Sequence, residues 1–303
     1  MPLQAVVDQI LEMAQLPHAS PKPQIFMHAE MKTLPYSKVN FSQSRFKTTS
    51  PTRLLQYWSE EQADIRRAAI RGDGATVQTL LSAGVDANLV DESGDTPLST
   101  AAGAGREAVV RILLDAGADV NAGRSLAKAA NGGYEAVVRI LLKSGADVNA
   151  GRPLREAAKC GHEAVVRILL EFGVDVDAGR SLAKAAKRGY EAVVQMLLDA
   201  GADVNAGRPL QKAAKGGHEA VVRILLNAGA DVNLRDDNDN TPLFEAAGIG
   251  NKAVVQALLN AGAEVNLKNR QGRTPYWEAV VRRHDAVIEM LRKAGAKSDL
   301  SQV

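Results

Sequence analysis

Hydrophobic and polar positions repeat along this chain with a period of 28 residues, in units that begin at Gly123, Gly151, Gly179 and Gly207. Within one period, the apolar residues at 154, 157 and 158 follow the three-to-four-residue spacing of a helix. A denser apolar run over residues 164–170 follows the turn at Gly161 and predicts a second helix that is buried on most sides. Each period therefore predicts a pair of short helices.

The repeated units are of two alternating types. Units that open with Gly-Arg-Ser-Leu carry Tyr134 or Tyr190 at the turn, and units that open with Gly-Arg-Pro-Leu carry His162 or His218. This alternation indicates duplication of a two-unit block. Internal repeats with periods of about 20 to 50 residues are typical of solenoids, in which one unit cannot bury its own apolar face.

Three further segments carry longer versions of the same unit opening, over residues 91–102, 241–247 and 274–279. Their Thr-Pro-Leu or Thr-Pro-Tyr openings resemble the start of ankyrin repeats, and the recurring Gly-His-Glu-Ala-Val-Val-Arg-Ile-Leu-Leu and Gly-Ala-Asp-Val-Asn-Ala complete that consensus. The similarity extends from about Ser59 to Leu300. It implies an all-α ankyrin-repeat solenoid of stacked helix pairs with short hairpin turns, and a concave groove that meets protein partners.

Set against this family pattern, the chain contains eight units of unequal length. We expect an N-terminal extension over residues 1–59, partly helical and partly irregular, and a repeat domain over residues 60–303. The four central units lack five residues relative to the family's 33-residue unit. The missing residues belong to the tip of the hairpin finger. Recognition should then shift to the floor formed by the first helices, or to the full-length units at either end.

Composition narrows the class of protein. Aromatic residues make up 4% of the chain, so the core must consist mainly of Ala, Val, Leu and Ile. The net charge of +2 names no partner by itself, and the one cysteine, Cys160, excludes an intramolecular disulfide framework. The chain has no apolar run long enough to span a bilayer and no leader-like N-terminus. We expect a soluble protein of the cytoplasm or nucleus without membrane contact.

The main candidate binding feature is a ladder of basic residues at the repeat spacing, with an arginine at each shortened turn and lysines on the first helix. Because arginine pairs with carboxylate and phosphate, the ladder predicts an acidic or phosphorylated protein partner. Nucleic acid is disfavoured, since no aromatic residues are interleaved for base stacking. The predicted partner-binding residues are Arg124, Lys128, Arg152, Arg180, Lys184, Lys187, Arg208, Lys212, Lys215, Phe244 and Trp277.

Two of these assignments have structural alternatives. An aspartate series with the same period, which includes Asp175, Asp203 and Asp231, could neutralise the ladder arginines within the fold. Trp277 occupies the position of Phe244 in the preceding unit, and it could either cap the last unit or serve as an exposed aromatic anchor.

Catalytic motifs are missing from the sequence. It contains no paired cysteines, no His-Glu-x-x-His and no phosphate-binding glycine loop, so we expect no metal and no cofactor. Three histidines, His162, His218 and His284, occupy the turn position of the repeat, where we expect each to cap the second helix of its own unit.

The N-terminal extension differs in composition from the repeats. Residues 2–16 have the spacing of an amphipathic helix, and residues 22–53 contain six basic residues and one acidic residue, Glu30. This segment could cap the first unit, bind along the stack or recruit a partner. The sequence thus predicts a non-catalytic protein-protein interaction module, an adaptor or scaffold. The alternative is an enzyme or enzyme subunit whose chemistry depends on the extension packed on the repeats. The oligomeric state stays open.

Overall fold

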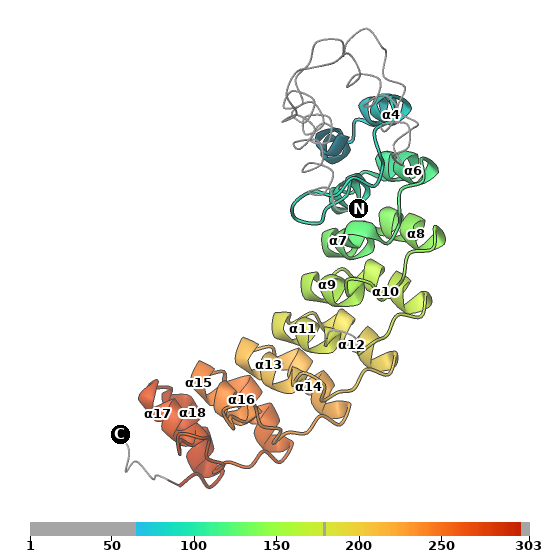
Figure 1. Ribbon diagram of the computed structural model, residues 1–303. Coiled ribbons are helices and arrows are strands. Elements are labelled where there is room, and N and C mark those ends of the chain that lie inside the picture. Colours follow the sequence, from blue (N-terminus) through green and yellow to red (C-terminus); the bar gives the residue numbers. More distant parts are fainter. Residues whose placement is uncertain (1–64, 178–179, 298–303) are drawn as a thin grey trace, which may run out of the picture. The chain divides into compact units, whose positions relative to one another are not determined.

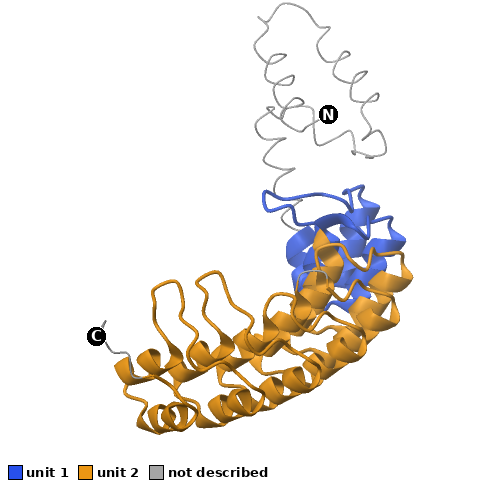
Figure 2. Ribbon diagram, turned by 90° about the horizontal axis from the view of Figure 1, so that it is seen from below, with its two compact units in different colours: residues 1–123 blue, residues 124–303 orange. Residues whose placement is uncertain are grey.

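The computed structural model describes residues 65–177 and 180–297. The described residues form helices and turns with no β-strand, which confirms the all-α prediction. They fall into two compact units, Met1–Gly123 and Arg124–Val303, coloured separately in Figure 2. The expected domain boundary at residues 59 and 60 lies outside the described residues and stays a prediction, as do the expectations for the extension.

Over the residues that the structure describes, both units are built from helix pairs. In unit 1, residues 65–71 are helical. They are followed by α4 (Gly74–Ser82), α5 (Pro97–Gly103) and α6 (Glu107–Asp115), and the short η1 (Ala122–Arg124) spans the end of the unit. Unit 2 consists of α7 (Ser125–Gly132), α8 (Glu135–Lys143), α9 (Pro153–Cys160), α10 (Glu163–Glu171), α11 (Ser181–Arg188), α12 (Glu191–Asp199), α13 (Pro209–Gly216), α14 (Glu219–Asn227), α15 (Pro242–Ile249), α16 (Lys252–Asn260), α17 (Pro275–Val281) and α18 (Asp285–Lys293).

Within unit 2 the helices form two rows. The odd-numbered helices from α7 to α17 are the first helices of their pairs and lie in one row, and the even-numbered helices lie in the other (Figure 1). Nine residues separate α8 from α9, α10 from α11 and α12 from α13, whereas 14 residues precede both α15 and α17. The two longer connections stand out from unit 2 in Figure 2. The shortening of the central units is therefore a loss of the finger.

The first helices begin differently in long and short units. In the long units a threonine caps the helix, as Thr241 accepts from the N–H of Phe244 and Thr274 from that of Trp277, and a proline follows. In the short units an arginine holds this position with a left-handed φ of 58° to 61°, and its side chain makes no cap bond. The finger and the threonine cap are thus lost together.

Small side chains allow the first helices to stack closely. The alanine pair in the middle of each first helix of the shortened units is fully buried, as at Ala185 and Ala186, and a leucine one turn earlier, such as Leu154, is 1% exposed. The second helices contribute valines such as Val166, which is 0% exposed. Burial of each leucine or valine side chain stabilises the folded state by about 1.5 to 3 kcal/mol. This burial requires the neighbouring units, because no helix pair can enclose its own apolar face.

A series of hydrogen bonds from Asn and Asp side chains joins successive turns within unit 2. The side-chain oxygen of Asn149 accepts from the N–H of Asp175 at 2.9 Å, and that of Asn205 accepts from the N–H of Asp231 at 3.0 Å. Between them, Asp177 accepts from Asp203 at 3.0 Å. The repeated Asn or Asp thus ties the backbone of each turn to the next unit.

The turn histidines act between units rather than within one. The Nε2 atom of His162 lies 3.0 Å from the carbonyl oxygen of Asn131, that of His218 lies 3.1 Å from Lys187, and that of His284 lies 3.1 Å from Gly248. None of the three caps its own helix. The predicted cap was wrong. Each ring instead reaches a backbone carbonyl near the C-terminal end of the first helix of the preceding unit, where the last carbonyl groups have no partner within the helix.

This contact predicts an unequal response of two glycines to the same substitution. Gly189 and Gly201 both have a positive φ, 77° and 88°. A Cβ at Gly189 would lie 2.6 Å from Nδ1 of His218, whereas at Gly201 it would meet no atom within 4 Å. We expect Gly201→Ala to cost about 1 to 2 kcal/mol for the left-handed backbone alone, and Gly189→Ala to cost more.

The measurement is the midpoint of urea unfolding followed by circular dichroism. Gly201→Ala is the matched control, since it shares the backbone strain and lacks the ring contact. Equal midpoints for the two variants would contradict the proposed role of the histidine contact between units.

Candidate partner-binding surface

The exposed side of the first-helix row carries most of the predicted ladder lysines. Lys184 and Lys187 are three residues apart on α11, and Lys212 and Lys215 have the same spacing on α13, so each pair shares one helix face. The alanines between them face inward and are fully buried. The helix period therefore directs the lysines to the surface and the alanines to the core.

Lys184 is the most crowded of these cations. Partial burial is the largest cause of its lowered pKa, and the positive charges of Arg155, Lys187 and Lys212 lower it further. Among the described residues, no ion pair joins Lys184, Lys187 or Lys212 to a carboxylate. We call Arg155, Lys184, Lys187 and Lys212 the central basic cluster.

Arg155 was missed in the sequence. It belongs to α9 at the position filled by Ala127 and Ala183 in neighbouring units, which was a signal that the repeat comparison could have used. The residue is half-buried, and its Nε is a buried group without a hydrogen-bond partner in the described structure. The charge of Arg155 acts on Lys184 of the next first helix and lowers its pKa, so Arg155 adds to the positive charge of the surface.

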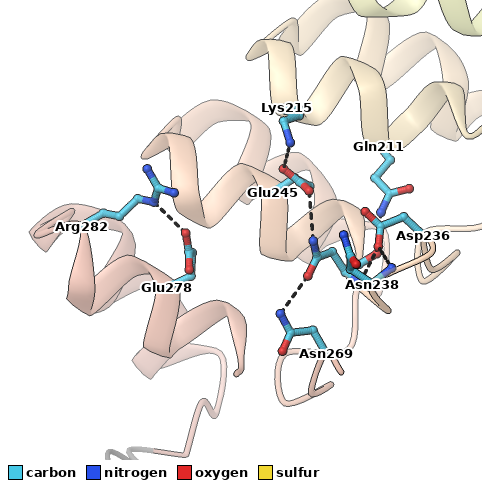
Figure 3. A network of polar contacts seen from close by, with 9 residues as sticks. Gln211, Lys215, Asp236, Asn238, Glu245, Asn269, Glu278 and Arg282 are labelled. Atoms are coloured by element: carbon cyan, nitrogen blue, oxygen red, sulfur yellow. Dashed lines mark hydrogen bonds and ion pairs between the residues drawn. The ribbon is translucent and has the colours of Figure 1, made fainter. Parts of the chain in front are cut away.

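Lysines at the margins of the cluster are neutralised. Lys159 pairs with Glu156 at 3.1 Å, and Lys215 pairs with Glu245 at 3.1 Å. Glu245 also accepts from Asn240, which in turn accepts from Asn269, so the last two fingers are joined to the helix row (Figure 3). The structure thus separates Lys215 from the other predicted lysines. Lys128, on α7, is partly exposed and is not without an interaction partner, so it is not counted with the central basic cluster.

The ladder arginines lie at the N-terminal edge of the same row. Arg208 pairs with Asp237 of the following finger, with Nη2 and Oδ1 2.7 Å apart. This bond lowers the pKa of Asp237 and raises that of Arg208. The other three, Arg124, Arg152 and Arg180, are exposed.

For three members of the aspartate series, the structure shows a local role in place of the ion pairs that the alternative supposed. Asp175, Asp203 and Asp231 each accept from the backbone N–H two residues later, and the ion pairs of the described residues join none of the three to a ladder arginine. Their short side chains close local turns.

The two predicted aromatic anchors are buried. Phe244 is 8% exposed and Trp277 is 9% exposed. The guanidinium carbon of Arg273 lies 4.2 Å from the centre of the Trp277 ring, and the indole Nε1 has no hydrogen-bond partner among the described atoms. The packing favours a structural cap, and partner contact with either residue stays a prediction.

Within residues 65–177 and 180–297, no group of three or more His, Cys, Asp or Glu side chains is arranged to hold a metal ion. No helix in these segments is long and apolar enough to cross a membrane.

Comparisons with known proteins agree on the family. The family described as ankyrin repeats matches residues 65–152, 151–208 and 210–302. The crystal structure of the human ASB11 ankyrin repeat domain is similar, with a TM-score of 0.60 and 30% sequence identity. The match covers 67% of this chain and 99% of that chain. No curated protein sequence matches the chain.

The crowding around Lys184 has a consequence for stability. A lysine whose pKa is lower in the folded state opposes folding while it is protonated, so its charge is a small penalty at pH 7. We expect Lys184→Gln to raise the free energy of unfolding by a few tenths of a kcal/mol, the size of a like-charge pair on a helix. Lys184→Arg, which keeps the charge, is the control and should not.

The sign of the shift also sets the pH dependence. The penalty is fully present below the lowered folded pKa and is lost as the pH rises to the ordinary lysine pKa. The gain in Lys184→Gln should therefore fade in strongly alkaline buffer. Chemical denaturation at pH 7 and above pH 10 measures it, and a loss of stability in Lys184→Gln at pH 7 would contradict the repulsion.

Proposed function

The chain belongs to the ankyrin repeat family, and from that premise we propose that it is a non-catalytic adaptor or scaffold that binds an acidic segment of a protein partner. The binding surface would be the row of first helices in unit 2, with the central basic cluster in its middle. Ankyrin repeats generally serve as protein-protein interaction modules.

The observation that carries the proposal is the contrast between the centre and the margins of this row. At the margins, Lys159 and Lys215 each have a carboxylate within 3.1 Å. In the centre, the charges of Arg155, Lys187 and Lys212 oppose the protonated form of Lys184, and the charge of Glu156 offsets them only in part, since the pKa of Lys184 stays lowered and no ion pair of the described residues engages it. A bound carboxylate or phosphate group would form charge-assisted hydrogen bonds and remove the repulsion.

A carboxylate-bearing or phosphorylated protein segment fits this surface better than nucleic acid does. The exposed faces of α9, α11 and α13 carry no aromatic side chains on which bases could stack. The chain's net charge of +2 is also low for a protein that neutralises many phosphates. Local rather than global positive charge supports recognition of a short acidic segment.

A rigid helix row favours such binding energetically. The first helices pack through fully buried alanines and leucines, so their exposed lysines stand on a scaffold that is ordered before the partner arrives. The partner then bears most of the ordering cost. Positive charge on the row would also increase the association rate at low ionic strength.

The proposal predicts that removal of the central lysines weakens acidic ligands selectively. The triple variant Lys184→Ser, Lys187→Ser and Lys212→Ser should bind a labelled Glu-rich peptide at least tenfold more weakly, roughly the effect of losing three exposed pairs of up to 1 kcal/mol each. Fluorescence anisotropy across a salt series measures it, and the variant should also show a flatter salt dependence.

The matched control removes the same charge from the other row. Lys143, Lys252 and Lys293 lie exposed on the second helices α8, α16 and α18. Their triple replacement by Ser should leave peptide binding near the wild-type value, and circular dichroism verifies that both variants are folded. Equal weakening by the two triples would reduce the effect to net charge and reject the site.

A further inference from the structure

In one finger of the protein, a carboxylate already forms an ion pair with one of the ladder arginines. The finger before α15 places Asp237 against Arg208, the residue that immediately precedes α13 in the preceding unit. The two side chains are 2.7 Å apart and lie at the surface, with 35% of Arg208 and 88% of Asp237 exposed. The charge of Arg180, one unit further back, also lowers the pKa of Asp237.

The remaining ladder arginines present the same geometry without a finger. Arg124, Arg152 and Arg180 share the left-handed backbone of Arg208, with φ between 58° and 61°. A Cβ at Gly207 would lie 2.9 Å from Cδ of Arg180, and one at Gly151 would lie 3.3 Å from Cβ of Arg124. These two arginine side chains therefore rest against the first glycine of the following unit.

Those following units are the shortened ones. The connections before α9, α11 and α13 contain nine residues and have no finger to supply a carboxylate. Among the described residues, no ion pair engages Arg124, Arg152 or Arg180. Three arginines are thus arranged like Arg208, and none of them meets a counterpart of Asp237.

The choice of arginine is not explained by the backbone. Glycine and asparagine adopt a left-handed conformation at lower cost than arginine does. The side chain makes no cap bond to the helix that follows it in any of the four units. Duplication of the two-unit block repeats this cation at a fixed spacing, and the exposed side chains of Arg124, Arg152 and Arg180 make no helix-capping bond.

We propose that the partner segment replaces the missing fingers and sets carboxylates against Arg124, Arg152 and Arg180 as Asp237 is set against Arg208. This inference rests on the proposed function and specifies its ligand. The occupant is an acidic stretch of polypeptide that runs along the N-terminal edge of the first helices.

The repeat spacing fixes the spacing of acidic residues in the partner. Packed helices lie about 8 to 10 Å apart. A polyproline II segment rises about 3.1 Å per residue with three residues per turn, so every third side chain points the same way at about 9 Å intervals. The matching ligand carries Asp or Glu at every third position of such a segment.

Two synthetic peptides test the spacing. The first is a labelled Asp-Pro-Pro repeated four times, and the second has the same composition with its four Asp residues contiguous. The full-length chain should bind the spaced peptide about three- to tenfold more tightly, as expected when two or three exposed pairs align. Equal affinities would overturn the finger-replacement inference.

Variants separate this inference from the proposed function. Arg152→Asn with Arg180→Asn keeps a residue that tolerates the left-handed backbone and should weaken the spaced peptide about two- to fivefold per arginine. Asp237→Asn should act oppositely, because it frees Arg208 for the ligand and tightens binding. Unchanged affinity in both variants would refute the inference.

The two failures differ in their patterns. If the arginine variants are silent while the triple lysine variant loses both peptides, the partner surface stands and finger replacement is wrong. If neither peptide binds, the proposed acidic ligand itself is wrong. Inorganic phosphate serves as competitor, and complete displacement of the spaced peptide at low millimolar phosphate would indicate a simple anion site instead.

Discussion

The structure depends on close stacking of helix pairs that cannot bury their apolar faces alone. Fully buried alanines such as Ala185 and Ala186 keep the first helices near one another, and glycine turns admit the histidine ring of the next unit. The hydrogen bonds from the repeated Asn and Asp side chains then fix the turns to each other, as between Asn149 and Asp175. Each unit therefore takes its stability from its neighbours, and the surface residues inherit a regular spacing.

Regular spacing alone would give a uniform surface, but the charges divide it. The finger before α15 supplies Asp237, which pairs with Arg208 of the preceding unit, and helix α15 itself supplies Glu245, which pairs with Lys215. The shortened units have no finger to place a carboxylate against Arg124, Arg152 or Arg180. On α11 and α13, Lys184 and Lys212 occupy the position that glutamate fills on α9 and α15, and the neighbouring cations repel Lys184. The electrostatic contrast along the helix row therefore has two sources, the missing fingers and the lysines that replace glutamate on the helices.

Much of this architecture follows from the sequence, because it depends on local periodicity. The helix pairs, the glycine turns and the shortened connections are all encoded within one repeat. Contacts between repeats were harder to predict from the sequence. The histidine rings turned out to bond the preceding unit, and Asp203 closes a local turn rather than pairing with an arginine. Arg155 was overlooked because its role comes from lysines on helices 28 and more residues away. Periodicity reveals which face a residue occupies and not which neighbour it meets.

The different starts of the first helices bear on how the protein opens. Thr241 and Thr274 cap α15 and α17, and a cap of this kind contributes about 1 kcal/mol. The arginine-led helices α7, α9, α11 and α13 forgo it and hold strained backbone in addition. Among the first helices of unit 2, local unfolding at the leading turn should therefore cost less in these four than in α15 and α17, and their backbone amides should exchange with solvent sooner. A ligand bound at these turns would slow that exchange without changing the shape of the helix row.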